Sequence, residues 1–411
     1  MPYSSLEAKD ISQLCTVVDC EHKTAPYVEK SDYLVVRTSN VRNGQLLMAD
    51  MKYTTIDGYN EWTQRAIPEY GDVLFTREAP AGESCLVPQD QKVCMGQRMV
   101  MLRPKKDVTD PVFLSLILNT ERTKADIARL SIGSTVSRIN IADIKKLKVS
   151  SPPLSEQRKI AKILSTWDKV IATNEKLIAT SKQQKKALMQ QLLTGKKRLV
   201  NPETGKAFEG EWERHSMSDL VFIDRKSLGK KTPDDFEFQY ISLSDVAVGS
   251  ISKELEVHKF ASAPSRARRV IQEGDILLST VRPNLKGFAK VSGKHADCIA
   301  STGFSVLTPK KRVSGDYIHQ YIFSSHVTGQ IDSLVVGSNY PAINSSDVAG
   351  LKVYCPTYEE QQKIASVLTA ADKEIEVLEA KLSHFKQEKK ALMQQLLTGK
   401  RRVKVDEEVA A

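Results

Sequence analysis

A stretch of fourteen residues occurs twice in this chain, and this repeat constrains the fold more than any other feature. Residues 185–198 recur as residues 389–402 with thirteen of the fourteen positions identical and an offset of 204 residues. The same offset relates Glu156-Gln157 to Glu360-Gln361 and Gly133-Ser134 to Gly337-Ser338, so the register holds over some seventy residues. Two unrelated basic helices would not keep such a register, so the chain is predicted to be a tandem duplication.

The repeated region has the apolar spacing of a long coiled-coil helix. The apolar residues follow a four-three spacing in both copies: Ile160, Leu164, Trp167, Ile171, Ile178, Leu188 and Leu192, then Ile364, Leu368, Ile375, Leu378, Leu382, Phe385, Leu392 and Leu396. Ser155 is expected to cap the first helix, and Thr357 with Glu360 forms a capping box for the second. Gly195 and Gly399 mark the ends. Forty residues give rods of about 60 Å.

Two equal amphipathic rods in one chain are expected to bury their apolar stripes on each other, and antiparallel pairing is the easier geometry. Asn174 interrupts the first stripe with a polar side chain. It either fixes the register at some cost in stability or is merely tolerated, and the sequence leaves both readings open.

Two globular segments precede the helices, so four parts are predicted: residues 1–153, a helix over 154–195, residues 196–356 with a connector over 196–215, and a helix with a tail over 357–411. Short strands are expected near residues 33–37, 72–77 and 97–103, a helix over about 111–130, and related strands after residues 240, 274 and 303. The predicted class is α+β, with two α/β domains separated by two long antiparallel coiled-coil helices and an internal pseudo-two-fold repeat.

Composition narrows the function classes. The net charge of +10 and the pI near 9.1 favour a polyanionic partner. The six cysteines form no C-x-x-C pair, so no zinc site is expected, and reduced thiols in a cytoplasmic protein are predicted. The sequence has no apolar run long enough to cross a membrane and no signal-peptide core, so no membrane partner is expected.

Several of these motifs together resemble the specificity subunits of Type I restriction–modification systems. They are Pro152-Pro153-Leu154-Ser155-Glu156-Gln157 leading into Ile160-Ala161, the Leu-Leu-Thr-Gly-Lys helix ends, the Gly-Asp-(Val/Ile)-Leu strands and the Gly-Ser…Ile-Asn segments. The resemblance covers essentially the whole chain, although the second copy has Pro356-Thr357-Tyr358 where the first has Pro-Pro-Leu.

This resemblance implies two target-recognition domains, each reading one half of a split, asymmetric sequence in double-stranded DNA, held apart by the two helices. It implies no activity and no cofactor in this chain. Its implied partners are two modification subunits, which methylate adenine with S-adenosylmethionine, and restriction (motor) subunits, which use ATP and Mg²⁺. Rod length is expected to set the spacer between the half-sites.

Motifs of catalysis are missing from the sequence. It has no G-x-x-x-x-G-K-[ST] loop and no G-x-G-x-x-G turn. Asn339-Tyr340-Pro341 lacks the second proline of an adenine methyltransferase signature. Two alternatives remain: an enzyme with unrecognised motifs, which would turn over DNA with Mg²⁺ and S-adenosylmethionine, and a coiled-coil assembly protein without direct DNA readout, which would show no salt-dependent DNA affinity.

Candidate DNA contacts are polar and basic residues of loops and strand ends, where such readers are usually mounted. The matched Gly-Ser loops diverge after the serine, as two different half-sites would require, and the alternative is that they are structural turns. The predicted residues are Arg37, Arg42, Arg65, Arg77, Ser134 and Thr135 in the first globular segment, and Arg266, Arg268, Arg269, Arg282, Asn284, Lys286, Ser338, Asn339 and Tyr340 in the second.

Overall fold

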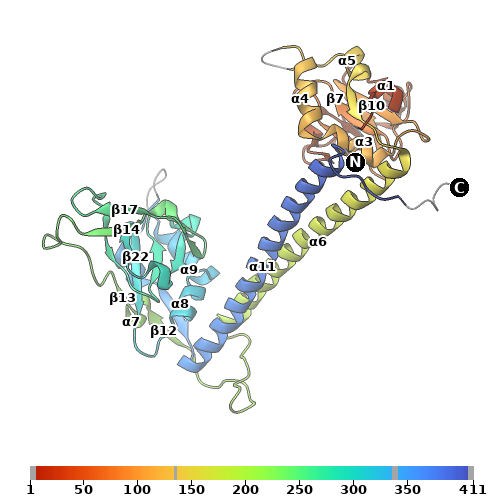
Figure 1. The fold of residues 1–411 in the computed structure, drawn as a ribbon. Helices are drawn as coiled ribbons and strands as arrows, with labels where there is room; N and C mark the ends of the chain where they lie inside the picture. The colour runs from red at the N-terminus through yellow and green to blue at the C-terminus, as the bar shows by residue number, and fades with distance from the viewer. Residues whose placement is uncertain (1–5, 134–136, 336–340, 406–411) are drawn as a thin grey trace. The chain divides into compact units, whose positions relative to one another are not determined.

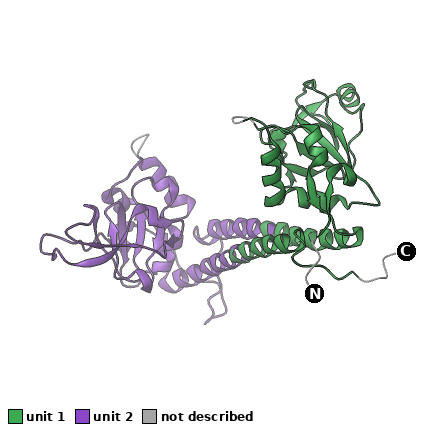
Figure 2. Ribbon diagram, turned by 45° about the horizontal axis from the view of Figure 1, so that its top comes forward, with its two compact units in different colours: residues 1–175, 380–411 green, residues 176–379 purple. Residues whose placement is uncertain are grey.

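The structure is a computed structural model that describes residues 6–133, 137–335 and 341–405. The chain divides into two compact units (Figures 1 and 2). Unit 1 comprises residues 1–175 and 380–411, and unit 2 comprises residues 176–379. Each unit therefore contains one globular part and portions of both long helices, α6 (Leu154–Leu192) and α11 (Tyr358–Leu396).

Unit 1 is built on a four-stranded antiparallel sheet in the order β2-β10-β7-β8. Its strands are β2 (Cys15–Asp19), β7 (Val73–Thr76), β8 (Ser84–Leu86) and β10 (Met99–Pro104). The other strands are β3 (Tyr33–Val36), β6 (Lys52–Thr54) and β9 (Lys92–Met95) in a second sheet, with the pairs β1 (Ala8–Asp10) and β11 (Lys148–Ser150), and β4 (Val41–Arg42) and β5 (Gln45–Leu46). The helices are α1 (Ile11–Leu14), η1 (Thr38–Asn40), α2 (Ile56–Trp62), α3 (Pro111–Leu118), α4 (Glu121–Leu130) and α5 (Ile141–Lys146).

Unit 2 repeats this plan with the sheet order β13-β22-β19-β20. These strands are β13 (Val221–Ile223), β19 (Ile276–Ser279), β20 (Phe288–Lys290) and β22 (Phe304–Pro309). The second sheet contains β14 (Glu237–Ile241), β17 (Glu256–Lys259), β18 (Ala267–Val270) and β21 (Ile299–Ser301), and the pairs are β12 (Glu213–Ser216) with β23 (Lys352–Cys355) and β15 (Val246–Ala247) with β16 (Ser250–Ile251). The helices are α7 (Met217–Leu220), η2 (Leu243–Asp245), η3 (Pro283–Leu285), η4 (Gly293–His295), α8 (Gly315–Tyr321), α9 (Ser325–Leu334) and α10 (Ser345–Gly350).

The central strands are continuous apolar runs because both faces of the sheet are covered. Side chains alternate between the two faces of a strand. Val73 and Phe75 of β7 therefore join the core beneath the helices, while Leu74 joins a second core on the opposite face. In unit 2, Ile276 and Leu278 of β19 join one core and Leu277 joins the other.

The coiled-coil stripe predicted from the sequence is confirmed. Within α6 and α11 the four-three positions are the buried or half-buried ones, and the residues between them are mostly exposed. In unit 1 Asp168 pairs with Lys389 and Glu175 with Lys386, and in unit 2 Asp372 pairs with Lys185 and Glu379 with Lys182. The residue numbers rise on one helix as they fall on the other, so the helix portions run antiparallel in both units. Asn174 is buried at 6 % exposure, as its place in the stripe requires.

The repeated Leu-Leu-Thr-Gly segment closes the core of each unit. Leu396 and Leu397, from the end of α11, pack into the unit 1 core. Leu192 and Leu193, from the end of α6, pack into the unit 2 core. Each globular part is therefore completed by the helix end of the other repeat, and the near-identity of residues 185–198 and 389–402 follows from two equivalent cores needing the same apolar cap.

The repeated Glu-Gln pair makes the same contacts in both units. The carboxylate of Glu156 accepts a bidentate hydrogen bond from Arg402 at 2.5 and 2.8 Å, and that of Glu360 accepts one from Arg198 at 2.7 Å for both bonds. Hydrogen bonding to these carboxylates raises the pKa of both arginines. These ion pairs tie the segment after one helix to the first turn of the other helix.

The glutamines Gln157 and Gln361 anchor a neighbouring helix in each unit. The Gln157 side chain accepts from the backbone N–H of Asp110 at 3.0 Å, and Gln361 accepts from that of Ser314 at 3.1 Å. Asp110 and Ser314 are the N-caps of α3 and α8. The repeated motif thus positions each long helix against its globular part.

Three boundary predictions can be compared with the structure. Gly195 and Gly399 have φ values of 69° and 73°, which confirms the left-handed helix ends. Ser155 as an N-cap is wrong, because α6 already begins at Leu154. The helix expected over 111–130 is two helices, because the Thr120 hydroxyl accepts from Thr123 N–H and starts a new helix there.

Candidate nucleic-acid interface

Backbone hydrogen bonds bring four loops of unit 2 to one edge of its main sheet. The loop after β19, residues 280–287, begins with Thr280, whose N–H donates to the carbonyl of Gly303 at 2.9 Å. Ile343 N–H donates to the carbonyl of Thr280 at 2.9 Å, and Arg282 N–H donates to that of Pro341 at 2.7 Å. The Thr302 N–H in turn donates to the Arg266 carbonyl at 2.8 Å. The predicted residues Arg266 and Arg282 therefore lie on adjoining loops.

Unit 1 has the equivalent edge. Arg77 N–H donates to the carbonyl of Arg98 at 2.8 Å, and Ile139 N–H donates to that of Arg77 at 3.0 Å. Glu78 and Arg138 also form an isolated antiparallel bridge. Ile139 and Ile343 are related by the repeat offset of 204 residues, so the same loop junction is built in both units from different residues.

Five predicted residues lie outside the described part of the chain. These are Ser134 and Thr135 in unit 1 and Ser338, Asn339 and Tyr340 in unit 2. The described neighbours of the second group take part in the loop junction, since Pro341 accepts the hydrogen bond from Arg282.

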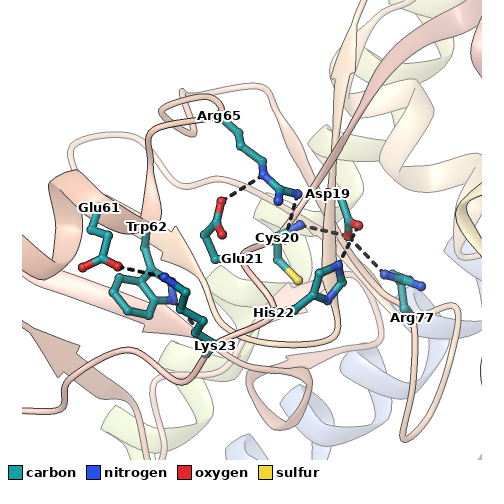
Figure 3. Close-up of polar contacts among 9 residues, drawn as sticks. All are labelled: Asp19, Cys20, Glu21, His22, Lys23, Glu61, Trp62, Arg65 and Arg77. Atoms are coloured by element: carbon teal, nitrogen blue, oxygen red, sulfur yellow. Dashed lines mark hydrogen bonds and ion pairs between the residues drawn. The ribbon is translucent and has the colours of Figure 1, made fainter.

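Arg65 and Arg77 of unit 1 are paired with carboxylates of the segment that ends β2 (Figure 3). Arg77 contacts Asp19 at 3.1 Å, and His22 contacts the same carboxylate at 3.0 Å. Arg65 contacts Glu21 at 2.9 Å and donates to the carbonyl of Cys20 at 3.1 Å. Arg77 keeps a side-chain exposure of only 14 %, so its first role is to fix the loop junction.

Arg37 and Arg42 follow β3 in unit 1. Arg37 donates to the Asp50 carboxylate at 2.9 Å and to the Asp50 carbonyl at 2.6 Å, and this contact, with a second from Lys52, lowers the pKa of Asp50. Arg42 donates to the carbonyls of Thr38 and Val41, both at 2.7 Å. Both guanidinium groups hold the 38–50 segment in place.

The three arginines of residues 266–269 have different surroundings. Arg269 forms an ion pair with Asp224 at 2.8 Å, and Asp224 also accepts from the Ser345 hydroxyl at 2.6 Å. Arg268 lies over the ring of Phe260 at 4.6 Å. Arg266 is exposed. The structure therefore leaves Arg266 better placed than Arg269 for a phosphate contact.

The structure also points to residues that the sequence prediction missed. Gln97 and Arg98 form the exposed turn before β10, and Arg98 pairs with Glu78 at 3.1 Å. The strand predicted over residues 97–103 begins later in the structure, because β10 starts at Met99. In unit 2 the loop after β13 carries exposed Lys226, Lys230 and Lys231. Their spacing in a polar run was the available signal.

Side chains that could hold a metal ion do not gather among the described residues of these edges. Within residues 6–133, 137–335 and 341–405, no group of three His, Cys, Asp or Glu side chains could hold a metal ion. The six cysteines are buried, and burial raises the pKa of Cys15, Cys85, Cys94 and Cys355 to about 12, far from that of a reactive thiolate. In the part of the chain that the structure describes, no helix is long and apolar enough to cross a membrane.

The edges combine guanidinium, ammonium, amide and hydroxyl groups on loops held by a rigid sheet. Such an arrangement suits recognition of phosphates and base edges. The site residues predicted from the sequence remain a prediction, now divided between exposed groups such as Arg266 and groups such as Arg77 that are engaged within the fold.

Comparisons with known proteins agree with one another over most of the chain. The type I restriction enzyme MjaVIII specificity subunit of Methanocaldococcus jannaschii is 26 % identical, with 76 % of each chain covered. The structure resembles the Type-I restriction-modification system S subunit from M. genitalium with a TM-score of 0.59 at 14 % identity, covering 97 % of this chain and 98 % of that one. It also resembles a chain from a structure on complex assembly and conformational transition of the type I R-M system, with a TM-score of 0.57 at 17 % identity and coverage of 97 % and 99 %.

The family match follows the internal repeat. The model of the Type I restriction modification DNA specificity domain matches residues 4–183 and again residues 210–386. These two matches cover most of the chain and fall one on each repeat. The chain therefore belongs to the family of Type I restriction–modification DNA specificity domains, of which it carries two copies.

Proposed function

We propose that this chain is the non-catalytic DNA specificity subunit of a Type I restriction–modification enzyme. The globular part of each unit reads one half of a bipartite, asymmetric site in double-stranded DNA. The observation that carries this proposal comes from comparing the two units. Glu156 in unit 1 and Glu360 in unit 2 make the same contact with an arginine that follows the other long helix, whereas the loops at the sheet edge differ in sequence between the units. Two units with the same helix contacts and different loops are suited to recognise two different half-sites.

The helices α6 and α11 form the attachment frame for two modification subunits and for the restriction subunits. The methyl donor S-adenosylmethionine acts on adenine in the modification subunits, and ATP and Mg²⁺ act in the motor–nuclease subunits. This chain supplies position and sequence selection. Its net charge of +10 supports association with DNA in a salt-dependent manner.

Reconstitution with the modification subunits tests the proposal. Plasmid DNA treated with the complex and S-adenosylmethionine is sequenced for methylated adenines. A two-part asymmetric motif with an unspecified spacer is expected, and the chain alone with DNA, Mg²⁺ and S-adenosylmethionine should give no product. Methylation without a sequence motif, or a complex whose DNA affinity does not depend on salt, would favour the alternative of an assembly protein without direct readout.

A further inference from the structure

The loop between β19 and β20 contains a short turn held by backbone hydrogen bonds. The inference drawn from this turn rests on the proposed function and adds to it. The 3₁₀ helix η3 (Pro283–Leu285) lies between two non-glycine residues in the left-handed region, Arg282 with φ 49° and Lys286 with φ 54°. Leu285 N–H donates to the Arg282 carbonyl and Lys286 N–H to the Pro283 carbonyl, both at 2.9 Å. Arg282 N–H bonds Pro341 at 2.7 Å, so the turn is fixed to the neighbouring loop as well.

The side chains of this turn differ in burial: one is buried in the fold, and two are exposed at the tip of the turn. Pro283 is buried, while Asn284 is exposed and Leu285 is exposed at 64 %. Unit 2 places few large apolar side chains so openly on its described surface, and this one stands between basic residues. Leu285 was not among the residues predicted from the sequence, because only polar and basic members of residues 282–286 were chosen as candidate contacts.

The chemistry of the tip selects one kind of ligand. Arg282 and Lys286 favour a polyanion, and an amide beside an apolar side chain matches the major-groove face of an A·T pair. Adenine presents N7 and N6 to an amide, and thymine presents its C5-methyl group to an apolar contact. The minor groove offers no methyl group and shows A·T and T·A alike, so an Asn-Leu pair would gain little there.

We infer that the 283–285 turn reads an A·T base pair in the major groove, with Leu285 covering the thymine methyl group and Asn284 hydrogen bonding to the adenine. The equivalent loop of unit 1, residues 77–83, carries Ala79 and Pro80 at its exposed positions and no large apolar tip. The two half-sites are therefore read by different side chains at this position, and the A·T pair belongs to the half-site of unit 2.

Thymine-to-uracil substitution tests this inference, because it removes the methyl group alone. After the motif has been mapped, each thymine in the half-site read by unit 2 is replaced by uracil, and the affinity of the reconstituted complex is measured by fluorescence anisotropy at fixed salt. One thymine is expected at which uracil weakens binding about fourfold, the value of one buried methyl group. Leu285→Ala should bind the thymine and uracil duplexes equally.

Val257→Ala is the matched control, because Val257 is an equally exposed apolar residue, at 63 %, on β17. It should keep the fourfold difference. Binding that is insensitive to uracil at every position, or a difference that persists in Leu285→Ala, overturns the inference while leaving the proposed function intact. 2-Aminopurine placed in the DNA site becomes more fluorescent when its base is unstacked. If binding raises this fluorescence and Leu285→Ala abolishes the rise, Leu285 acts as an intercalating wedge, and this result would also overturn the inference. Loss of all sequence-specific binding by the unmodified complex would instead refute the proposed function.

Discussion

Lys389 contacts the carboxylate of Asp168 at 2.5 Å, and the same contact recurs 204 residues away, where Lys185 meets Asp372 at 2.5 Å. A more exposed pair repeats in the same manner, with Lys386–Glu175 at 2.8 Å in unit 1 and Lys182–Glu379 at 2.6 Å in unit 2. The same ion pairs therefore hold the antiparallel helix portions of each unit in the same register. These equivalent contacts make the internal repeat pseudo-two-fold.

The Asp168–Lys389 pair gives a charge-swap prediction. Asp168→Lys places two cations together and should lower the free energy of unfolding by about 1 kcal/mol, because the pair is partly shielded from solvent. The double variant Asp168→Lys/Lys389→Asp should recover most of that loss in urea unfolding. Glu175→Lys at the more exposed pair is the control and should cost less. A double variant no more stable than the single one would show that this contact does not set the register.

The leucine caps give a prediction that separates the two units. Leu396→Ala should destabilise unit 1 by about 2–5 kcal/mol, because it opens a cavity in a closed core, and Leu192→Ala should do the same to unit 2. Hydrogen exchange should rise around Phe75 in the first variant and around Leu278 in the second. Leu177→Ala is the control, since Leu177 lies on α6 at 49 % exposure, and it should change little. If Leu396→Ala and Leu192→Ala both raised hydrogen exchange in the same unit, the conclusion that each leucine closes the core of a different unit would be wrong.

Arg266 and Arg269 are expected to respond differently to substitution. Arg266→Ala should leave the melting temperature unchanged, lower the DNA affinity of the reconstituted complex and reduce the slope of log affinity against log salt by about 1, as loss of one phosphate contact requires. Arg269→Ala should lower the melting temperature, because it leaves the carboxylate of Asp224 without its cation. A stable Arg269→Ala chain with the reduced salt slope would reverse these roles.

His319 gives unit 2 a predictable pH dependence. Burial is the main cause that lowers its pKa from 6.5 to about 4. The charges of Lys185 and Lys290 also lower this pKa, and those of Asp372 and Asp316 raise it. The unfolded chain binds the proton first, so the free energy of unfolding should fall as the pH drops from about 6.5 towards 4, by about 2–3 kcal/mol in total. Urea unfolding of the isolated chain at a series of pH values measures this slope.

His319→Phe is expected to flatten the slope over this pH range while keeping a ring against Phe323. His384→Asn, at an exposed position of α11, should leave it unchanged. An equal slope in the His319→Phe chain would assign the acid sensitivity to other groups.

The repeat, the two long helices and the helix ends at Gly195 and Gly399 could all be predicted from the amino-acid sequence. These features depend on spacing within the chain and on local backbone preference, and both can be read without knowing the partners. Strands near residues 72–77 and 97–103 could also be predicted, and β7 and β10 form there. Their burial on both faces, which removes the expected alternation, comes from the packing of the sheet.

Two features depend on the folded arrangement: which basic residues are engaged within the fold, and which helix end closes which core. Arg77 meets Asp19, which is 58 residues away, and Arg269 of β18 meets Asp224, which follows β13. Leu396 packs against a core built from the opposite end of the chain. Such contacts depend on how distant segments are brought together, and no local pattern encodes them. For the same reason the exposure of Leu285 at the tip of its turn was not predicted.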